Sequence, residues 1–365
     1  MCFNVCVKQV VDAGRHRPRR VTIRDIADLA DVSVATVSRV VNGRGDVADD
    51  TRLLVRRIVR EHGYVASRNT RGVSAGSDGL VVGVLVPLVH RVYFSAILAG
   101  AAEALYEQSI RLELSPTLHE HQREISVLER LMHGRSDGAL LILPDESSEE
   151  LEGLLDQGYR YVVVDPRKPL AERIPSVSAA HTSGADQAMQ HLLGLGHRRI
   201  AAVTGPAGRV ATDDRRRGYH AALASAGIMP DPALEVEGDF EVAGGFKAGD
   251  YLFELRDPPT AVFAFNDNLA IGVIQAARAR GLRVPEDVSV VGFDDLEHAT
   301  IVTPPLTTIR QPLAEMGRTA VSMLVRLLER QRFETLHVEL GTRLIVRHST
   351  AAPPRERMQA LQPTT

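Results

Sequence analysis

Cysteine is almost absent from this 365-residue chain, and long hydrophobic runs are absent altogether. Cys2 and Cys6 stand without the second pair of Cys or His ligands that a structural zinc site needs, so we expect no metal site. No stretch of 18 uncharged apolar residues exists, and the N-terminus lacks the apolar segment and cleavage site of a signal peptide. The sequence therefore favours neither membrane spanning nor export, and we expect a cytoplasmic protein.

Signatures of the common enzyme classes are missing as well. Gly205-x-x-Gly208 lacks the Lys and Ser/Thr of a phosphate-binding loop, and no Ser or Cys nucleophile stands in a recognisable elbow near His191 or His197. These histidines are better explained as structural, and no cofactor is expected. The alternative function class is an enzyme. Catalytic turnover of a sugar would establish that alternative.

Charge is distributed unevenly along the chain. Residues 1–78 hold 14 Lys and Arg against 9 Asp and Glu, whereas residues 79–365 hold 29 against 37. A basic first part joined to an acidic remainder suits a phosphate-contacting module attached to a domain that does not touch DNA. Residues 1–20 end in a basic run and are either a disordered arm that adds phosphate contacts or the product of a start codon placed too far upstream.

Residues 21–63 predict three short helices. Thr22 and Asp25 have the spacing of a capping box, and the next apolar residues recur at helical period. Ser33 opens a second helix after a three-residue turn, and a third helix is expected from Thr51 to about His62. The predicted apolar faces are Ile23, Ile26, Ala27 and Ala30; Val34, Val37 and Val41; and Leu54, Val55 and Ile58.

The outward side of the second helix carries short or hydrogen-bonding side chains. These are Val34, Ala35, Ser38, Arg39 and, just beyond the helix, Asn42. Such side chains can reach base edges, which is typical of a recognition helix in a helix-turn-helix. An ordinary three-helix core with a solvated polar face would give the same pattern, and the pattern alone does not separate the two.

This stretch contains the sequence motif Ala-x-x-Ala-x-Val-Ser-x-x-Thr-Val-Ser-Arg-Val-x-Asn. The motif resembles the DNA-binding domain of the lactose-repressor and galactose-repressor family of bacterial transcription factors. The resemblance implies that Val34 and Ala35 read the operator, that Thr36, Ser38, Arg39 and Asn42 occupy shared positions, and that Thr22 and Ser33 belong to the same DNA-binding surface. Asp31 stands where the family usually has Gly, and Asp tolerates the left-handed backbone that this turn needs.

Residues 64–79 are polar and rich in Gly and Ser, which predicts a linker. The resemblance implies a hinge that folds on DNA, with Tyr64, Arg68, Arg71 and Val73 at its contact positions. The departures from the family are Ala66 and Ser67 for Pro-Asn, Thr70 for Ala, Gly72 inside the expected helix, and Val73 for the minor-groove Leu.

From residue 80 the sequence alternates apolar runs with amphipathic helical stretches. The runs span 80–86, 138–143, 161–164, 200–203, 261–264 and 289–291. This alternation predicts an α/β fold with parallel sheets buried on both faces, in two lobes over residues 80–349 that split near Val177, with the chain crossing back near 293–312. A ligand site is expected in the cleft between the lobes, at the carboxyl ends of the strands. Residues 350–365 form a tail without heptad repeats.

Up to about Arg347, this region resembles the sugar-binding fold shared by those repressors and periplasmic sugar receptors. The motifs include Gly196-His197-Arg198-Arg199-Ile200, Phe265-Asn266-Asp267 and Val291-Gly292-Phe293-Asp294-Asp295. The resemblance implies an effector cleft lined by Asp165, Arg215, Asn266, Asp294 and Gln311, with Phe240 as a flat wall and Tyr93 and Phe94 near the mouth. Carboxylates, an amide and a guanidinium satisfy sugar hydroxyls, and an aromatic face covers the sugar ring.

Each cleft residue also has a purely structural explanation. Asn266 and Asp294 could cap the helices that follow them, Phe240 could belong to a core, and Arg215 could pair with Asp213 or Asp214. Ala180 and His181 stand where the family often has Asp-Asn, which puts that part of the rim in question.

The sequence as a whole predicts a homodimeric transcription repressor whose operator binding is controlled by a small-molecule effector, a sugar or sugar derivative. Two recognition helices related by a two-fold axis would read palindromic operator DNA. A second alternative is an architectural DNA binder with a ligandless body, which the absence of any ligand-induced thermal shift would favour.

Overall fold

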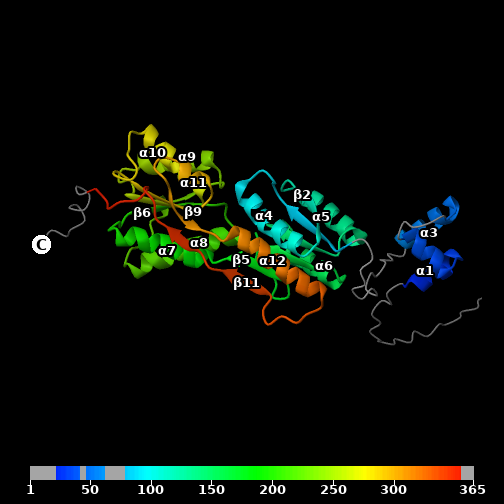
Figure 1. Ribbon diagram of the computed structural model, residues 1–365. Helices are drawn as coiled ribbons and strands as arrows, with labels where there is room; N and C mark the ends of the chain where they lie inside the picture. Colours follow the sequence, from blue (N-terminus) through cyan, green and yellow to red (C-terminus); the bar gives the residue numbers. More distant parts are fainter. Residues whose placement is uncertain (1–21, 42–46, 62–78, 355–365) are drawn as a thin grey trace, which may run out of the picture. The chain divides into compact units, whose positions relative to one another are not determined.

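The computed structural model describes residues 22–41, 47–61 and 79–354 of the chain (Figure 1). The chain forms two compact units, Met1–Ala75 and Gly76–Thr365, here called the headpiece and the body. The N-terminal arm, nearly all of the hinge and most of the tail lie outside the described residues.

The headpiece contains helices α1 (Ile23–Ala30), α2 (Val34–Val41) and α3 (Asp49–Glu61). The predicted capping box is present, because the Asp25 N–H donates to the Thr22 hydroxyl and the Thr22 N–H donates to the Asp25 carboxylate at 2.6 Å. Asp31 ends α1 in the left-handed conformation, with φ 50°.

One small core holds the three helices together, formed by Ile26, Ala27, Ala30, Val37, Val40, Val55 and Ile58. The assignment of Val34 to this apolar face is wrong, since its side chain is 41% exposed. Helical side chains lean toward the N-terminus, so the first residue of α2 extends past the start of the helix. Helix α3 begins two residues earlier than predicted, at Asp49 instead of Thr51.

The first lobe of the body is an all-parallel sheet in the order β11-β5-β4-β3-β1-β2. Its strands are β1 (Val81–Val86), β2 (Arg111–Pro116), β3 (Gly138–Ile142), β4 (Tyr161–Val164), β5 (Ser176–Ala179) and β11 (His337–Leu340). Helices α4 (Val92–Glu107) and α12 (Leu313–Leu328) cover one face, and α5 (His121–Arg130), η1 (Leu131–Arg135) and α6 (Ser148–Asp156) cover the other.

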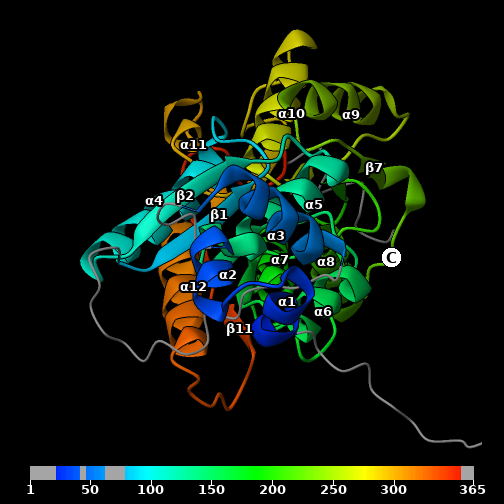
Figure 2. The same ribbon diagram turned by 90° about the vertical axis from the view of Figure 1, so that its right-hand side faces the viewer.

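Helices α4 and α12 lie side by side (Figure 2). A Cβ at Gly100 would come within 1.9 Å of the Ala314 carbonyl oxygen, so only glycine allows this approach. The close packing fixes α12 to the first lobe, although most of the second lobe precedes α12 in sequence.

The second lobe is a sheet in the order β12-β10-β9-β8-β6-β7, parallel except for β12. Its strands are β6 (Ile200–Thr204), β7 (Glu235–Glu237), β8 (Ala261–Ala264), β9 (Ser289–Asp294), β10 (Thr307–Arg310) and β12 (Arg343–Ile345). Helices α7 (His181–Gly194) and α8 (Val210–Ser225) pack on one face, and α9 (Val242–Glu254), α10 (Asp267–Ala279) and α11 (His298–Ile301) pack on the other; η2 (Pro232–Leu234) precedes β7.

The two-lobed α/β fold and its buried parallel strands confirm the predicted fold class. The chain passes between the lobes after Ala179, again between Arg310 and Leu313, and a third time between Leu340 and Arg343. Only the first two passages correspond to positions named from the sequence. Within the described residues, no helix is long and apolar enough to cross a membrane.

Candidate functional site

Helix α2 carries five of the seven candidate DNA-binding residues that the structure describes. Ser33, Val34, Ala35 and Arg39 are exposed, and Thr36 and Ser38 are half-buried. The Thr36 N–H donates to the Ser33 hydroxyl at 3.1 Å, so Ser33 is the start signal of this helix as the sequence predicted. Asn42, Tyr64, Arg68, Arg71 and Val73 lie outside the described residues.

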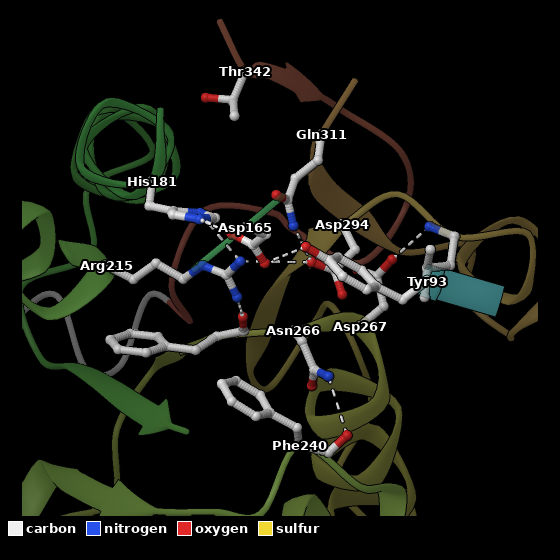
Figure 3. Close-up of polar contacts among 12 residues, drawn as sticks. Tyr93, Asp165, His181, Arg215, Phe240, Asn266, Asp267, Asp294, Gln311 and Thr342 are labelled. Atoms are coloured by element: carbon white, nitrogen blue, oxygen red, sulfur yellow. Dashed lines mark hydrogen bonds and ion pairs between the residues drawn. The ribbon is translucent and has the colours of Figure 1, made fainter. Parts of the chain in front are cut away.

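The body brings together six polar side chains between its lobes, here called the inner cluster: Tyr93, Asp165, His181, Arg215, Asp294 and Gln311 (Figure 3). Asp165 follows β4, Asp294 ends β9, and Gln311 follows β10. The carboxyl ends of parallel strands meet at one edge of a sheet, which is why residues so distant in sequence converge.

Asp165 is the hydrogen-bond acceptor at the centre of the cluster. The Tyr93 hydroxyl donates to one of its oxygens at 2.5 Å, and the His181 Nε2 lies 3.0 Å from the other. Burial favours the neutral acid, but the bonds from His181 and Tyr93 outweigh it and hold the pKa of Asp165 below its ordinary value. Asp165 is therefore a buried carboxylate. Burial, and then the charge of Asp165, raises the pKa of Tyr93 well above normal.

His181 joins Asp165 to Arg215. An Arg215 Nη lies 3.3 Å from the His181 Nδ1, and a guanidinium can only donate. The Nδ1 is therefore the acceptor in this contact, and the Nε2 donates to Asp165. The sequence pattern flagged His181 only as a departure from the family, although its place just after the first passage between lobes puts it at the centre.

Arg215 is buried, with 3% exposure, and its guanidinium faces the cluster. It donates to the Phe265 carbonyl, lies 3.8 Å from an Asp294 oxygen and stacks 3.9 Å from the centroid of the Phe293 ring. The alternative partners Asp213 and Asp214 pair instead with Arg216 and Arg217. The surface-pairing explanation of Arg215 is therefore wrong.

Asp294 receives a hydrogen bond from the Gln311 amide at 2.6 Å. Burial raises the pKa of Asp294 to about 7, with Arg215 and Gln311 opposing and the nearby Asp165 reinforcing the rise. Asp294 thus gains or loses a proton near neutral pH, while Asp165 stays ionised. The Gln311 Oε1 is buried without a partner among the described residues, which leaves an acceptor for a bound molecule.

Asp267 is a buried acid behind the cluster that the sequence quoted only within a motif. Its oxygens accept from the Thr308 hydroxyl at 2.5 Å and the Leu296 N–H at 2.8 Å. Burial, and then the charge of Asp294, raises its pKa well above the ordinary value. Asp267 ties three segments of the second lobe together.

Asn266 and Phe240 lie together at the edge of the cluster (Figure 3). The Asn266 Oδ1 accepts from the Leu269 N–H at 2.9 Å and caps α10, and its amide donates to the Phe240 carbonyl at 3.1 Å. The structural explanation of Asn266, as the residue that caps the following helix, therefore holds in this structure. Phe240 is half-buried, with φ 65° and its ring over Gly205, where a Cβ would lie 2.0 Å from the ring.

Phe94 is buried and packs edge-on against Tyr93, with ring centroids 5.5 Å apart. Among the described residues, no group of three or more His, Cys, Asp or Glu side chains is placed to hold a metal ion. The geometry suits a small ligand with several hydroxyl groups and one apolar face.

Two family models match this chain. "Bacterial regulatory proteins, lacI family" matches residues 22–67, and "Periplasmic binding protein-like domain" matches residues 189–350. The HTH-type transcriptional repressor CytR of Escherichia coli (strain K12) is 35% identical over 91% of this chain and 97% of its own. The HTH-type transcriptional repressor PurR of Aliivibrio fischeri (strain MJ11) is 34% identical over 90% of this chain and 98% of its own.

Solved structures give the same result. The transcriptional regulator CelR–cellobiose complex has a TM-score of 0.68 and 33% identity, and covers 90% of this chain and 100% of its own. The Lac repressor dimer bound to operator and the anti-inducer ONPF has a TM-score of 0.68 and 29% identity, and covers 92% of this chain and 100% of its own. Both the headpiece and the body are matched at once, and the chain belongs to the LacI family of bacterial regulatory proteins.

Proposed function

We propose that the chain is a homodimeric transcription repressor of the cytoplasm whose operator affinity is set by a small polyhydroxyl effector, most simply a sugar, bound at the inner cluster. We propose a regulator and not an enzyme, which binds its effector without a cofactor. The observation that carries the proposal is the inner cluster itself, which joins residues from both lobes through hydrogen bonds and the ion pair between Arg215 and Asp294.

A ligand entering this network would exchange its own hydroxyl groups for the bonds among Asp165, Arg215 and Asp294. A hydroxyl both donates and accepts, so it satisfies a carboxylate and a guanidinium together. Because Asp165 belongs to the first lobe and Arg215 and Asp294 belong to the second, such an exchange changes how the lobes are held together. A shift of the lobes would change the spacing of the two DNA-binding units in the dimer. Operator affinity would then change, because two copies that read a palindrome need a fixed spacing.

The test is a pair of variants at residues outside the headpiece. Arg215→Ala and Asp294→Ala should keep operator binding and lose the effector response. Each variant should bind the effector about ten-fold or more weakly, because it lacks one charge-assisted hydrogen bond to the effector. Arg217→Ala, an exposed position on the same helix, is the control.

A thermal-shift screen of sugars, sugar phosphates and nucleobases identifies the effector. Isothermal titration and fluorescence anisotropy with labelled operator then measure the two affinities. Unchanged effector affinity in both cleft variants would show that the effector binds elsewhere.

A further inference from the structure

A second set of charged side chains lies outside the inner cluster. Arg91, His119 and Arg167 belong to the first lobe and Arg209 to the second, and we call them the rim cluster. Their charges act on one another: burial and then Arg167 lower the pKa of His119, and burial and then Arg167 lower the pKa of Arg209. Positive groups from both lobes therefore converge.

Two of the guanidinium groups in the rim cluster are compensated. Arg91 pairs with Glu241 at 2.6 Å across the lobes, and Arg167 pairs with Asp145. Arg209 is half-buried and, across the described residues, forms neither a hydrogen bond nor an ion pair. Its one aromatic contact is the Phe240 ring, 5.8 Å from the guanidinium carbon. A partly buried charge without a partner is costly, so this arrangement has one positive charge in excess.

The backbone around Arg209 adds to the positive potential. Arg209 is the N-cap of α8 and Arg91 is the N-cap of α4, and neither side chain caps its helix. The first-turn N–H groups of a helix have no acceptor within the helix and favour an anion. One turn beyond Arg209, the buried Thr212 hydroxyl also lacks a partner among the described residues.

The rim cluster is continuous with the inner cluster through one residue. Phe240 lies beneath Arg209, and its carbonyl accepts from the Asn266 amide at the edge of the inner cluster. In addition, the Val210 N–H donates to the Arg167 carbonyl at 3.1 Å, which places the start of α8 against the first lobe. Phe240 therefore contacts both Arg209 and the residue at the edge of the inner cluster.

We propose that the rim cluster is an anion-binding subsite that takes a phosphate group of the effector, while the inner cluster takes its hydroxyl groups. Resting on the proposed function, this narrows the effector to a phosphorylated sugar. Guanidinium groups and helix N-termini both bind phosphate oxygens, whereas a neutral sugar would leave Arg209 without a partner. A carboxylate shares this chemistry, and the experiment separates the two.

The experiment uses the full chain in thermal-shift and isothermal titrations. The probes are inorganic phosphate against chloride at equal ionic strength, ribose against ribose 5-phosphate, and glucose against glucose 6-phosphate and gluconate. The variant Arg209→Gln keeps the length of the side chain and removes its charge. Arg217→Gln is the matched control, since Arg217 is exposed on the same helix and pairs with Asp214.

We expect inorganic phosphate and a phosphorylated sugar to stabilise the parent, with about a ten-fold loss of affinity in Arg209→Gln and none in Arg217→Gln. Binding of gluconate in preference to the phosphates, lost in Arg209→Gln, would keep the anion subsite and assign it to a carboxylate. Equal binding of each sugar and its phosphate, or unchanged phosphate affinity in Arg209→Gln, would overturn the subsite.

The same titrations distinguish this inference from the proposed function. If unphosphorylated sugars alone change operator affinity, effector control stands and the anion subsite is wrong. If phosphate binds at Arg209 but no bound compound changes operator affinity, the subsite stands and effector control is wrong.

Discussion

Two buried carboxyl groups in the first lobe make its stability depend on pH. Glu124 on α5 is 2% exposed and Glu146, in the loop after β3, is 3% exposed. Glu124 accepts from the Asp145 N–H at 3.2 Å, whereas both Glu146 oxygens lack a partner within the described residues. Burial raises the pKa of Glu124 to about 7, and burial followed by the charge of Glu124 raises the pKa of Glu146 to about 8.

The sign of the effect follows from proton uptake. The folded chain holds these protons to a higher pH than the unfolded chain, so the stabilisation is present below pH 4.5 and is lost as the pH rises through 7 and 8. Moving one carboxyl pKa from 4.5 to about 7 corresponds to about 3 kcal/mol of unfolding free energy. Moving the Glu146 pKa from 4.5 to about 8 corresponds to about 5 kcal/mol, and both values are upper limits because the two carboxyl groups titrate together.

Glu146→Gln removes one member of the pair and keeps its size. The variant should match the parent at pH 5 and exceed its unfolding free energy by about 1 to 3 kcal/mol at pH 8, which is about 2 to 4 °C in Tm for each kcal/mol. Thermal unfolding followed by circular dichroism from pH 5 to 8.5 measures this. Glu149→Gln, an exposed carboxylate at the start of α6, is the control. The reasoning is refuted if the difference in Tm between Glu146→Gln and the parent is the same at both ends of that range.

Three further predictions concern other parts of the chain. Exchanging Val34 and Ala35 for other residues should change the preferred operator without abolishing binding, and an unchanged preference in a binding-selection assay would contradict this. His181→Ala should lower the unfolding free energy by about 1 to 3 kcal/mol at pH 7, because it leaves the buried Asp165 acceptor unsatisfied; urea denaturation checks this, and parent-like stability would show that the bridge is not needed. Gly72→Ala with Val73→Leu, outside the described residues, should tighten operator binding and blunt the effector response, since the two changes favour a helix by about 1 kcal/mol and add about 0.8 kcal/mol of apolar burial per chain. Anisotropy titrations giving equal operator affinity would show that this stretch is not a folding hinge.

Local pattern was enough to predict the three helices of the headpiece and six strands of the body, which are β1, β3, β4, β6, β8 and β9. The capping box at Thr22 and the helix start at Ser33 depend on residues three positions apart, so they can be found along the chain. Runs such as 161–164 and 261–264 are apolar at every position because both faces of those strands are buried, and this signal survives without any knowledge of partners. Six strands were missed. β2, β7, β11 and β12 are partly exposed, and β5 and β10 are short strands that contain Ser or Thr.

The sequence by itself determined that the chain has a helix-turn-helix unit and a two-lobed α/β body, and it named cleft residues by motif. Only the tertiary structure decided which of them act together. His181 bridges Asp165 and Arg215, and the Asn266 side chain caps α10. Arg209 lies over the Phe240 ring and forms no ion pair among the described residues. The physical reason is that protonation and pairing depend on burial and on neighbours more than 30 positions away, such as Arg215 from His181. Burial and these distant neighbours are set only when the two sheets bring the ends of their strands together.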